Sequence, residues 1–154
     1  GKAVPPEAVA KQNITVFHNG QGLPAGKGTA NQGFALYKEK CAECHNEKGE
    51  GREAQYPRLV GGAGTLSSAK PVKTITSYWP YATTVWDTIH RAMPYDQPRT
   101  LSPNETYAIT AVLLHWSGLI AADFEVNEKT LPQIKMPNRD GFVPDSRPHS
   151  RRQK

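Results

Sequence analysis

Cysteine and methionine are scarce in this chain, which has two of each among its 154 residues. A structural zinc site uses four cysteine or histidine ligands in closely spaced pairs. Only one cysteine pair is present, and no two histidines lie three to five residues apart. The sequence therefore disfavours a structural zinc site. Any cysteine chemistry must come from the single pair Cys41 and Cys44.

Long apolar runs are also missing. No run approaches the roughly 18–20 residues that span a bilayer as a helix, and the longest apolar patch, Tyr107–Trp116, is interrupted by Thr110 and His115. The first residues show neither the basic start nor the apolar stretch of a secretory signal. We therefore expect no membrane span and, if the protein is exported, a mature form whose signal peptide has been removed.

Apolar residues are few for a chain of this length. They make up 37% of it, the mean hydropathy is −0.62, and glycine and proline contribute 13 residues each. Such a composition predicts a small core and much irregular structure. A cofactor that binds only the native state would add its binding free energy to folding.

The net charge of +5 comes mainly from the chain ends. Residues 1–32 hold three cations and one carboxylate. Residues 33–120 hold nine cations and eight carboxylates, and residues 121–154 hold seven cations and five carboxylates. The middle segment lacks the basic stripe with interleaved aromatics that nucleic-acid binding requires, so no nucleic-acid partner is expected. The terminal cations are consistent with docking on an acidic partner or with a solvated tail; they include Arg147, Arg151, Arg152 and Lys154.

Three segments between residues 31 and 120 predict helices, so we expect an all-α domain there. Asn31 can cap a first helix that carries Phe34 and Tyr37. A second pattern runs from Tyr81 to Ala92 and must end before a proline. The third begins at the capping box Ser102–Glu105 and stops at Gly118.

The remaining segments predict little regular structure. Residues 1–30 are rich in glycine and proline, with one strand-like run at 14–17, and are expected to form an extended arm. Residues 121–154 form an irregular basic tail, and both ends are candidate partner contacts. Residues 46–80 are also irregular, and a loop of that length fits a chain that wraps a non-protein group.

The sequence Cys41-Ala42-Glu43-Cys44-His45 is typical of covalent c-type haem attachment. Two thiols three residues apart can add across the two vinyl groups of one haem, and the adjacent histidine then lies beneath the iron. A thioredoxin-like redox pair would follow a strand, whereas a helical pattern precedes this one. A structural disulfide across two residues is the other alternative. We predict one covalent haem c, with His45 as an axial iron ligand.

A second axial ligand is expected from the opposite side of the haem. The candidates are Met93, Met136, His90 and His115. Met93 is favoured because it follows a helix end and precedes Pro94, which turns the chain. A methionine opposite a histidine raises the reduction potential of the iron. If Met93 did not bind, the iron would be open, as in a haem enzyme or gas sensor.

Three further residues are predicted to line the haem. The carbonyl of Pro57 can accept the second ring N–H of His45. Tyr78 and Trp79 precede the second helix, and their polar groups can meet haem propionates. An ordinary loop proline and simple core packing are the alternatives.

The order of these elements resembles the class I cytochrome c fold over residues 31 to about 118. In that family the first and last helices cross closely, so the resemblance implies contacts between Phe34 or Tyr37 and the Tyr107/Ala111 face. A more specific resemblance covers nearly the whole chain. Residues 77–87 and 91–94, arm residues 14–17 and 22–24, and tail residues 130–132 and 135–142 are similar to haem subunits of periplasmic sulfur-oxidising molybdenum enzymes.

Those relatives are sulfane dehydrogenase of the thiosulfate-oxidising (Sox) pathway and related sulfite dehydrogenases. The resemblance implies a molybdenum-cofactor partner that oxidises the sulfur substrate and passes electrons singly to this haem, and then to a downstream acceptor such as another cytochrome. The chain would not be an enzyme on its own. Some relatives have two haem domains, whereas this chain has one haem motif.

Two other functions remain open at this point, a freely diffusing electron carrier and a haem protein with open iron. Covalent haem attachment takes place outside the bacterial inner membrane, so a periplasmic location is expected. The sequence leaves open the choice between sulfite and protein-bound sulfane as substrate, the reduction potential, the terminal acceptor and the stoichiometry.

Overall fold

The computed structural model describes residues 1–52 and 55–144, with the side chain of Lys11 left out. The helices are α1 (Pro6–Gln12), α2 (Ala30–Lys40), α3 (Ala42–His45), α4 (Ala82–Ala92), α5 (Pro103–Trp116) and the 3₁₀ turn η1 (Leu131–Gln133). Two short antiparallel strands, β1 (Lys27–Gly28) and β2 (Val126–Asn127), complete the described elements. No helix in these two ranges is long and apolar enough to cross a membrane.

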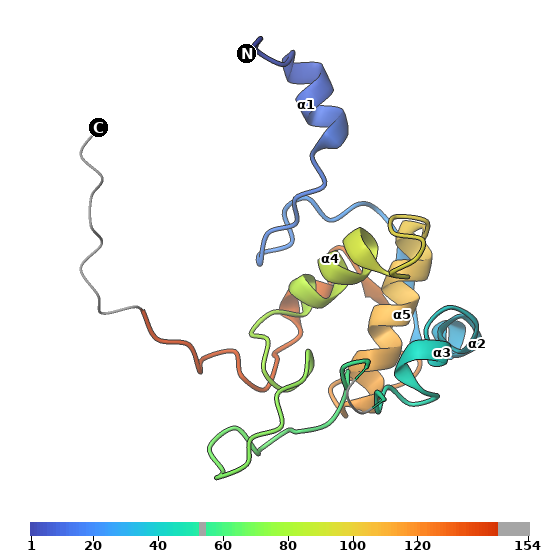
Figure 1. Cartoon of the computed structure of the whole chain (residues 1–154), viewed down its shortest axis with the longest axis vertical. Coiled ribbons are helices and arrows are strands. Elements are labelled where there is room, and N and C mark those ends of the chain that lie inside the picture. Colours follow the sequence, from blue (N-terminus) through green and yellow to red (C-terminus); the bar gives the residue numbers. More distant parts are fainter. Residues whose placement is uncertain (53–54, 145–154) are drawn as a thin grey trace.

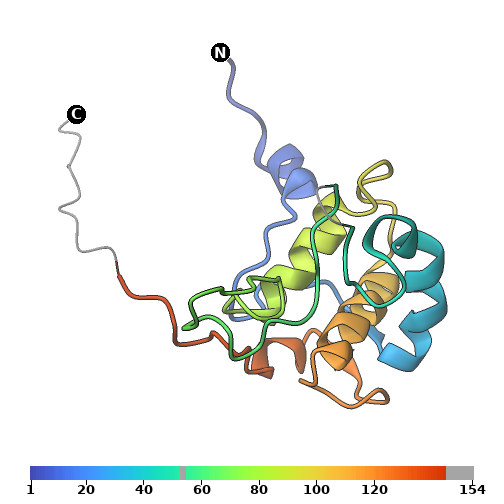
Figure 2. The ribbon, with the colours of Figure 1, turned by 60° about the horizontal axis from the view of Figure 1, so that its bottom comes forward.

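Helix α5 is the central element, with α2 packed on one side and α4 on another (Figures 1 and 2). Its capping box is present, because the Ser102 hydroxyl accepts the Glu105 amide at 3.3 Å and the Glu105 carboxylate accepts the Ser102 amide at 2.8 Å. The helix ends before Gly118, whose φ of +72° favours glycine. Both predicted ends are therefore confirmed.

Helix α2 begins two residues earlier than a cap at Asn31 implies, and Asn31 is not its cap. Thr29 is the cap, and it shares a capping box with Gln32 through hydrogen bonds of 3.3 and 3.0 Å. Glutamine three residues after threonine satisfies two amides at once, which explains why Thr29 takes this position. The predicted helix from Tyr81 to Ala92 is confirmed, with Tyr81 as the residue before α4.

The close crossing of α2 and α5 is made by Gly33, whose backbone lies against Ala108 and Val112. The aromatic side chains of α2 contact the far end of α5. The Phe34 ring lies 5.8 Å from His115, and the Tyr37 ring lies 4.7 Å from Trp116. The expected close crossing of α2 and α5 is confirmed, and the ring partners of Phe34 and Tyr37 on α5 are His115 and Trp116.

The N-terminal arm has more structure than predicted. Residues 6–12 form α1, which stands clear of the other helices in Figure 1. Proline at its first position and an acidic residue in its first turn favour a helix start. The strand-like run 14–17 forms no strand and instead leads into turns, with Phe17 donating its amide to Gln21.

The first half of the predicted tail belongs to the core. Leu131, Ile134 and Met136 are buried with the central helices, and β2 pairs with β1. The 3₁₀ turn η1 packs against α4, so apolar residues of this segment cover part of that helix. The segment predicted as an irregular tail from residue 121 therefore packs with the core as far as Met136. The basic residues Arg147, Arg151, Arg152 and Lys154 lie outside the described residues.

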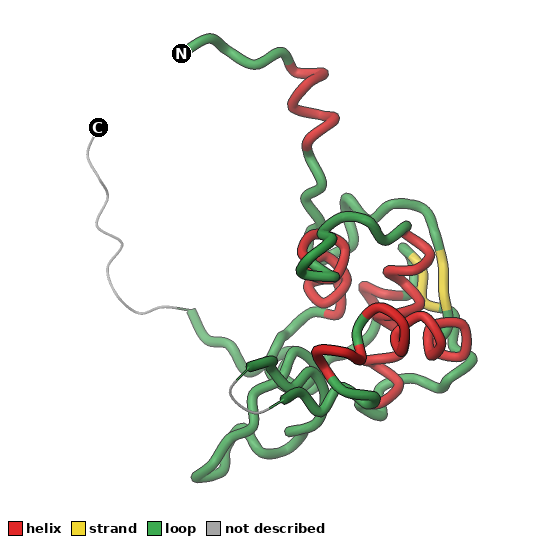
Figure 3. Tube along the Cα trace, turned by 45° about the vertical axis from the view of Figure 1, so that its right-hand side comes forward, coloured by secondary structure: helices red, strands yellow, loops and turns green. Residues whose placement is uncertain are grey.

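Residues 46–80 contain no helix or named strand in their described part, as predicted (Figure 3). Side-chain hydroxyls hold this loop in place of a backbone ladder. Thr74 donates to the Gly61 carbonyl at 2.8 Å, Thr76 to the Leu59 carbonyl at 3.3 Å, and Ser77 to the Val72 carbonyl at 3.0 Å. All three hydroxyl residues are buried, so the loop is fixed against the core.

Candidate haem site

The two cysteines lie where α2 passes into α3. Cys41 follows the last residue of α2, and Cys44 lies one turn further on within α3. Side chains three residues apart on a helical turn lie on one face, so both sulfurs can reach one group. Burial raises the pKa of the Cys41 thiol to about 12, so this sulfur is neutral and forms part of an apolar lining.

His45 is held by the loop that follows it. Its Nδ1 lies 3.1 Å from the Pro57 carbonyl oxygen, the acceptor expected from the sequence. With Nδ1 bound there, the ring presents Nε2 as its free nitrogen, which is the arrangement of metal-ligating histidines. The structure therefore brings together two of the predicted site residues.

Gly51 allows the loop to return to His45. Its amide donates to the His45 carbonyl at 3.0 Å, and its φ is +73°. A β-carbon at this position would lie 2.8 Å from the Pro57 carbonyl carbon and 2.6 Å from the Arg58 nitrogen. Only glycine fits this turn without displacing the Pro57 carbonyl.

Met93 follows the last residue of α4 and is half-buried. Its amide donates to Ile89 at 3.0 Å, so the helix holds its backbone while its φ and ψ are already extended. Cys41, Trp79 and Met93 all pack against the same buried cluster. The predicted haem-attachment residue Cys41 and the predicted iron ligand Met93 thus lie at the border of the same hydrophobic core.

The other axial candidates have different surroundings. Met136 is 1% exposed within the core, and His115 Nδ1 lies 3.1 Å from the Ile120 carbonyl. His90 stacks on Trp86, with ring centroids 4.6 Å apart, and burial lowers its pKa. Met93 differs from the other three in lying directly after a helix end and directly before a proline.

Tyr78 and Trp79 are both half-buried before α4. Tyr78 is occupied by protein contacts, since its ring lies 5.3 Å from the Phe142 ring and 4.9 Å from Lys73 Nζ. Trp79 packs against the core. The two neighbours therefore have different surroundings, and Trp79, which faces the core, is better placed than Tyr78 to contact a cofactor.

Three buried polar atoms in the described ranges have no hydrogen-bond partner; they are Tyr37 Oη, Trp86 Nε1 and His90 Nδ1. Such atoms are rare in native proteins because each costs about 1–3 kcal/mol. Trp86 is 0% exposed, so water does not reach its N–H. Trp86, His90 and Met93 are spaced four and three residues apart, which places them on one face of α4.

These atoms fit a haem. Its carboxylates are acceptors for an indole or phenol group, and the metal occupies its ring nitrogens. Sequence reasoning missed Trp86 as a site residue, because one tryptophan on an amphipathic helix also fits simple core packing. The signal available was its spacing of seven residues from Met93.

Comparisons with known proteins identify the family to which the chain belongs. A family model described as cytochrome c matches residues 30–117. The chain is similar to the crystal structure of sulfane dehydrogenase SoxCD from Paracoccus pantotrophus, at 44% sequence identity and a TM-score of 0.87, over 95% of this chain and 71% of that chain. No curated protein matches at a significant level.

The matched segment contains the single motif Cys41–His45, and its two cysteines account for one covalent haem c. The helical architecture and the similarity over nearly the full chain agree with the expected fold and with the relation to the Sox proteins. The chain is an electron-transfer protein that belongs to the cytochrome c family, with a class I fold and one covalent haem c.

Proposed function

We propose that this chain is the monohaem electron-transfer subunit of a sulfur-oxidising dehydrogenase. It accepts single electrons from a molybdenum-cofactor catalytic subunit that oxidises a sulfane or sulfite substrate, and passes them to a downstream acceptor such as another cytochrome. The observation that carries the proposal is the 44% identity to sulfane dehydrogenase SoxCD over 95% of the chain. That coverage includes most of the arm and tail, which a haem domain does not need for binding its cofactor.

In this proposal Cys41 and Cys44 hold the haem, and His45 and Met93 are its axial ligands. The bound iron supplies one-electron chemistry by changing its oxidation state. The chain keeps the imidazole of His45 in one orientation through Pro57, at 3.1 Å. Half-burial of Met93 and the loop 46–80 limit access of water, so electrons rather than ligands exchange at this site.

In this proposal Pro57, Trp79 and Trp86 would further border the haem, while Tyr78, also a candidate from the sequence, keeps its contacts with Lys73 and Phe142. The chain has no catalytic residue for sulfur oxidation of its own in this proposal, because substrate chemistry takes place on the partner. Covalent attachment of haem supports a periplasmic location. The arm at residues 1–30 and the tail after residue 136 are the proposed partner contacts.

Isolation of the native protein under high salt tests this function. We expect a stoichiometric second polypeptide that contains molybdenum, because obligate interfaces are large and apolar and hold in high salt. Gel filtration with metal analysis of each fraction is the measurement. A lone haem protein without molybdenum would contradict the subunit function and favour the freely diffusing carrier.

The unpartnered N–H of Trp86 leads to a spectroscopic prediction. In the haem-loaded protein we expect it to donate to a haem carboxylate, because no protein acceptor lies within reach of Nε1 among the described residues. Ultraviolet resonance Raman spectroscopy reports indole hydrogen bonding, and the Trp86→Phe difference spectrum should show a bonded N–H. Loss of this bond should lower the free energy of unfolding by about 1.5–3 kcal/mol.

Trp116→Phe and Trp79→Phe are the matched controls, since each also removes one indole. Their difference spectra identify the signals of the other two tryptophans. An indole signal of Trp86 without a hydrogen bond would show that the haem carboxylates lie elsewhere.

A further inference from the structure

The two ends of the chain meet at Tyr81, the residue before α4. The ring of His18, from the arm, lies 5.0 Å from the Tyr81 ring, and the guanidinium of Arg139, from the tail, lies 4.3 Å from its centroid. The Tyr81 backbone also pairs with Lys135. Residues separated by about 120 positions in the sequence therefore contact one side chain.

Other contacts fix the arm on α4. Arg91 Nη2 donates to the Ile14 carbonyl at 3.0 Å while it pairs with Asp87 at 2.8 Å. The Thr83 hydroxyl donates to the His18 carbonyl at 3.5 Å. The turn after His18 is thereby held against the same helix that ends at Met93.

The tail is fixed beside the arm. Asn138 Nδ2 donates to the Tyr78 carbonyl at 2.7 Å, and the Phe142 ring lies 5.3 Å from the Tyr78 ring. Gly20 of the arm approaches Pro132 so closely that a β-carbon would lie 2.5 Å from its Cγ. In Figures 1 and 2 both segments lie along α4 on the side away from α2. Arm and tail thus form one continuous surface.

Several large hydrophobic side chains are exposed on this surface. Nine large hydrophobic side chains are exposed among the described residues. Three of them, Phe17, Phe142 and Val143, belong to this surface, whereas Val4 and Val9 lie before and on α1, which stands clear of the other helices. Clustered exposed apolar groups mark interaction sites. Aromatic side chains such as Phe17 and Phe142, 49% and 52% exposed, are typical anchors of interfaces.

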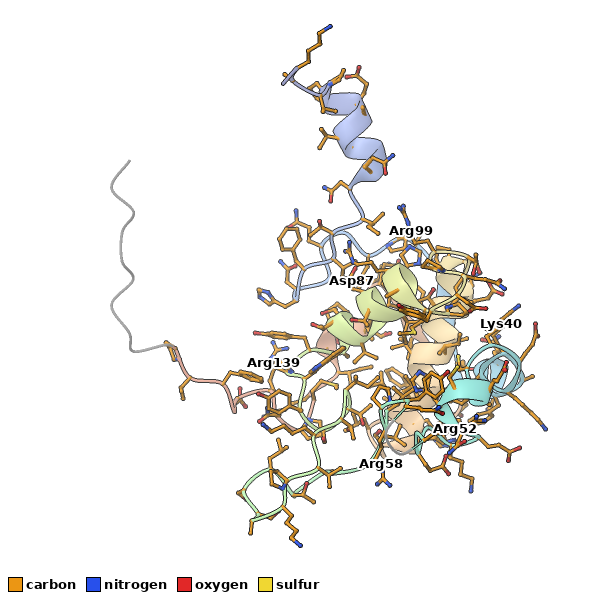
Figure 4. The ribbon with its side chains drawn as sticks, in the orientation of Figure 1. Lys40, Arg52, Arg58, Asp87, Arg99 and Arg139 are labelled. Carbon is orange, nitrogen blue, oxygen red and sulfur yellow. The ribbon has the colours of Figure 1, made fainter. Side chains whose placement is uncertain are left out.

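The surface is also basic. Besides the paired Arg91 and Asp87, its charged groups are Lys73, Arg139 and the pair Lys135 and Asp140, while residues 13–24 contain no lysine, arginine or carboxylate. Lys73 and Arg139 lie over the tyrosine rings 78 and 81. By contrast, residues 38–50 around the cysteines hold three lysines and four glutamates. Figure 4 shows Arg139 on the opposite side of the molecule from Lys40 and Arg52.

We propose that arm and tail form a single composite docking surface around Tyr81, and that the catalytic subunit covers it with an acidic face that has apolar pockets. We call this the junction surface, and it comprises Phe17, His18, Tyr78, Tyr81, Arg139 and Phe142. The inference rests on the proposed function and adds to it where the partner binds and which chemistry it presents. Arm and tail then act together, and neither end is an independent tether.

The test uses the full haem-loaded chain and its isolated catalytic subunit. Phe17→Ser changes the arm, and Phe142→Ser and Arg139→Glu change the tail. Titration calorimetry should show the dissociation constant rising at least about tenfold for each variant, as for interface hot spots. Lys40→Glu on α2 is the matched control and should bind like the unchanged chain. An unchanged haem spectrum and melting temperature verify that each variant is folded.

The outcomes separate the two proposals. If the unchanged chain binds and only the arm variant or only the tail variants lose affinity, the composite surface is wrong while the subunit function stands. The proposed junction surface is also wrong if all variants bind as tightly as the unchanged chain, or if Lys40→Glu loses as much affinity as the arm and tail variants. If the unchanged chain does not bind the catalytic subunit at all, both proposals fail.

Discussion

Replacing Met93 with alanine is expected to open the sixth coordination position of the iron. The thioether is lost from Met93, the candidate that lies directly after the end of α4. The reduction potential should then fall on the order of 0.1 V, a fraction of the roughly 0.8 V that axial ligands span. Spectroelectrochemistry measures the potential, and carbon monoxide binding to the reduced variant measures the open position.

Met136→Leu is the matched control, because this methionine is 1% exposed in the core and leucine has a similar volume. Its potential and spectrum should remain unchanged. If Met93→Ala kept the spectrum and potential of the unchanged chain, Met93 would not be the ligand. A change on Met136→Leu alone would move the assignment to the tail.

Gly33→Ala is expected to have the largest effect on stability. The added methyl would lie 2.7 Å from the carbonyl carbon of Ala108 and 2.7 Å from Val112 Cγ2. A backbone group cannot turn aside as a side chain can, so α2 and α5 must separate. We expect a loss of about 2–3 kcal/mol in the free energy of unfolding, seen as a fall in melting temperature on the order of 10 °C.

Ala35→Ser is the control for this substitution, since it changes an exposed position on the same helix. Its cost should stay near the helix propensity difference of about 0.5 kcal/mol. Thermal unfolding of the haem-loaded forms, followed by circular dichroism, compares the two. Equal melting temperatures for both variants would show that the crossing can widen without cost.

Local signals predicted the haem domain well. The motif Cys41–His45, the box at Ser102 and the proline after Met93 each act within a few residues, so the sequence pattern contains them completely. The predicted cap of α2 is wrong because threonine and asparagine are both good cap residues. Only Gln32, which completes a capping box with Thr29, distinguishes Thr29 from Asn31.

Contacts between residues far apart in the chain could not be predicted from the sequence pattern. The sequence places Met136 in the irregular tail, because a single apolar residue beside a proline carries no periodicity, yet it is 1% exposed in the core cluster. The convergence of His18 and Arg139 on Tyr81 depends on the path of both chain ends. For Trp86, the missing information was which polar atoms the protein itself leaves without a partner.

The buried hydroxyls of Thr74, Thr76 and Ser77 have a consequence for the speed of electron transfer. They bond to one another as well as to the loop carbonyls, with Thr74 and Ser77 oxygens 3.1 Å apart. A satisfied buried network is rigid, although the loop has no helix or strand in its described part. A site whose surroundings hardly move when the iron gains an electron has a small reorganisation energy. In the proposed haem site this loop would give the cofactor a stiff frame, and each electron could leave with little rearrangement of the protein.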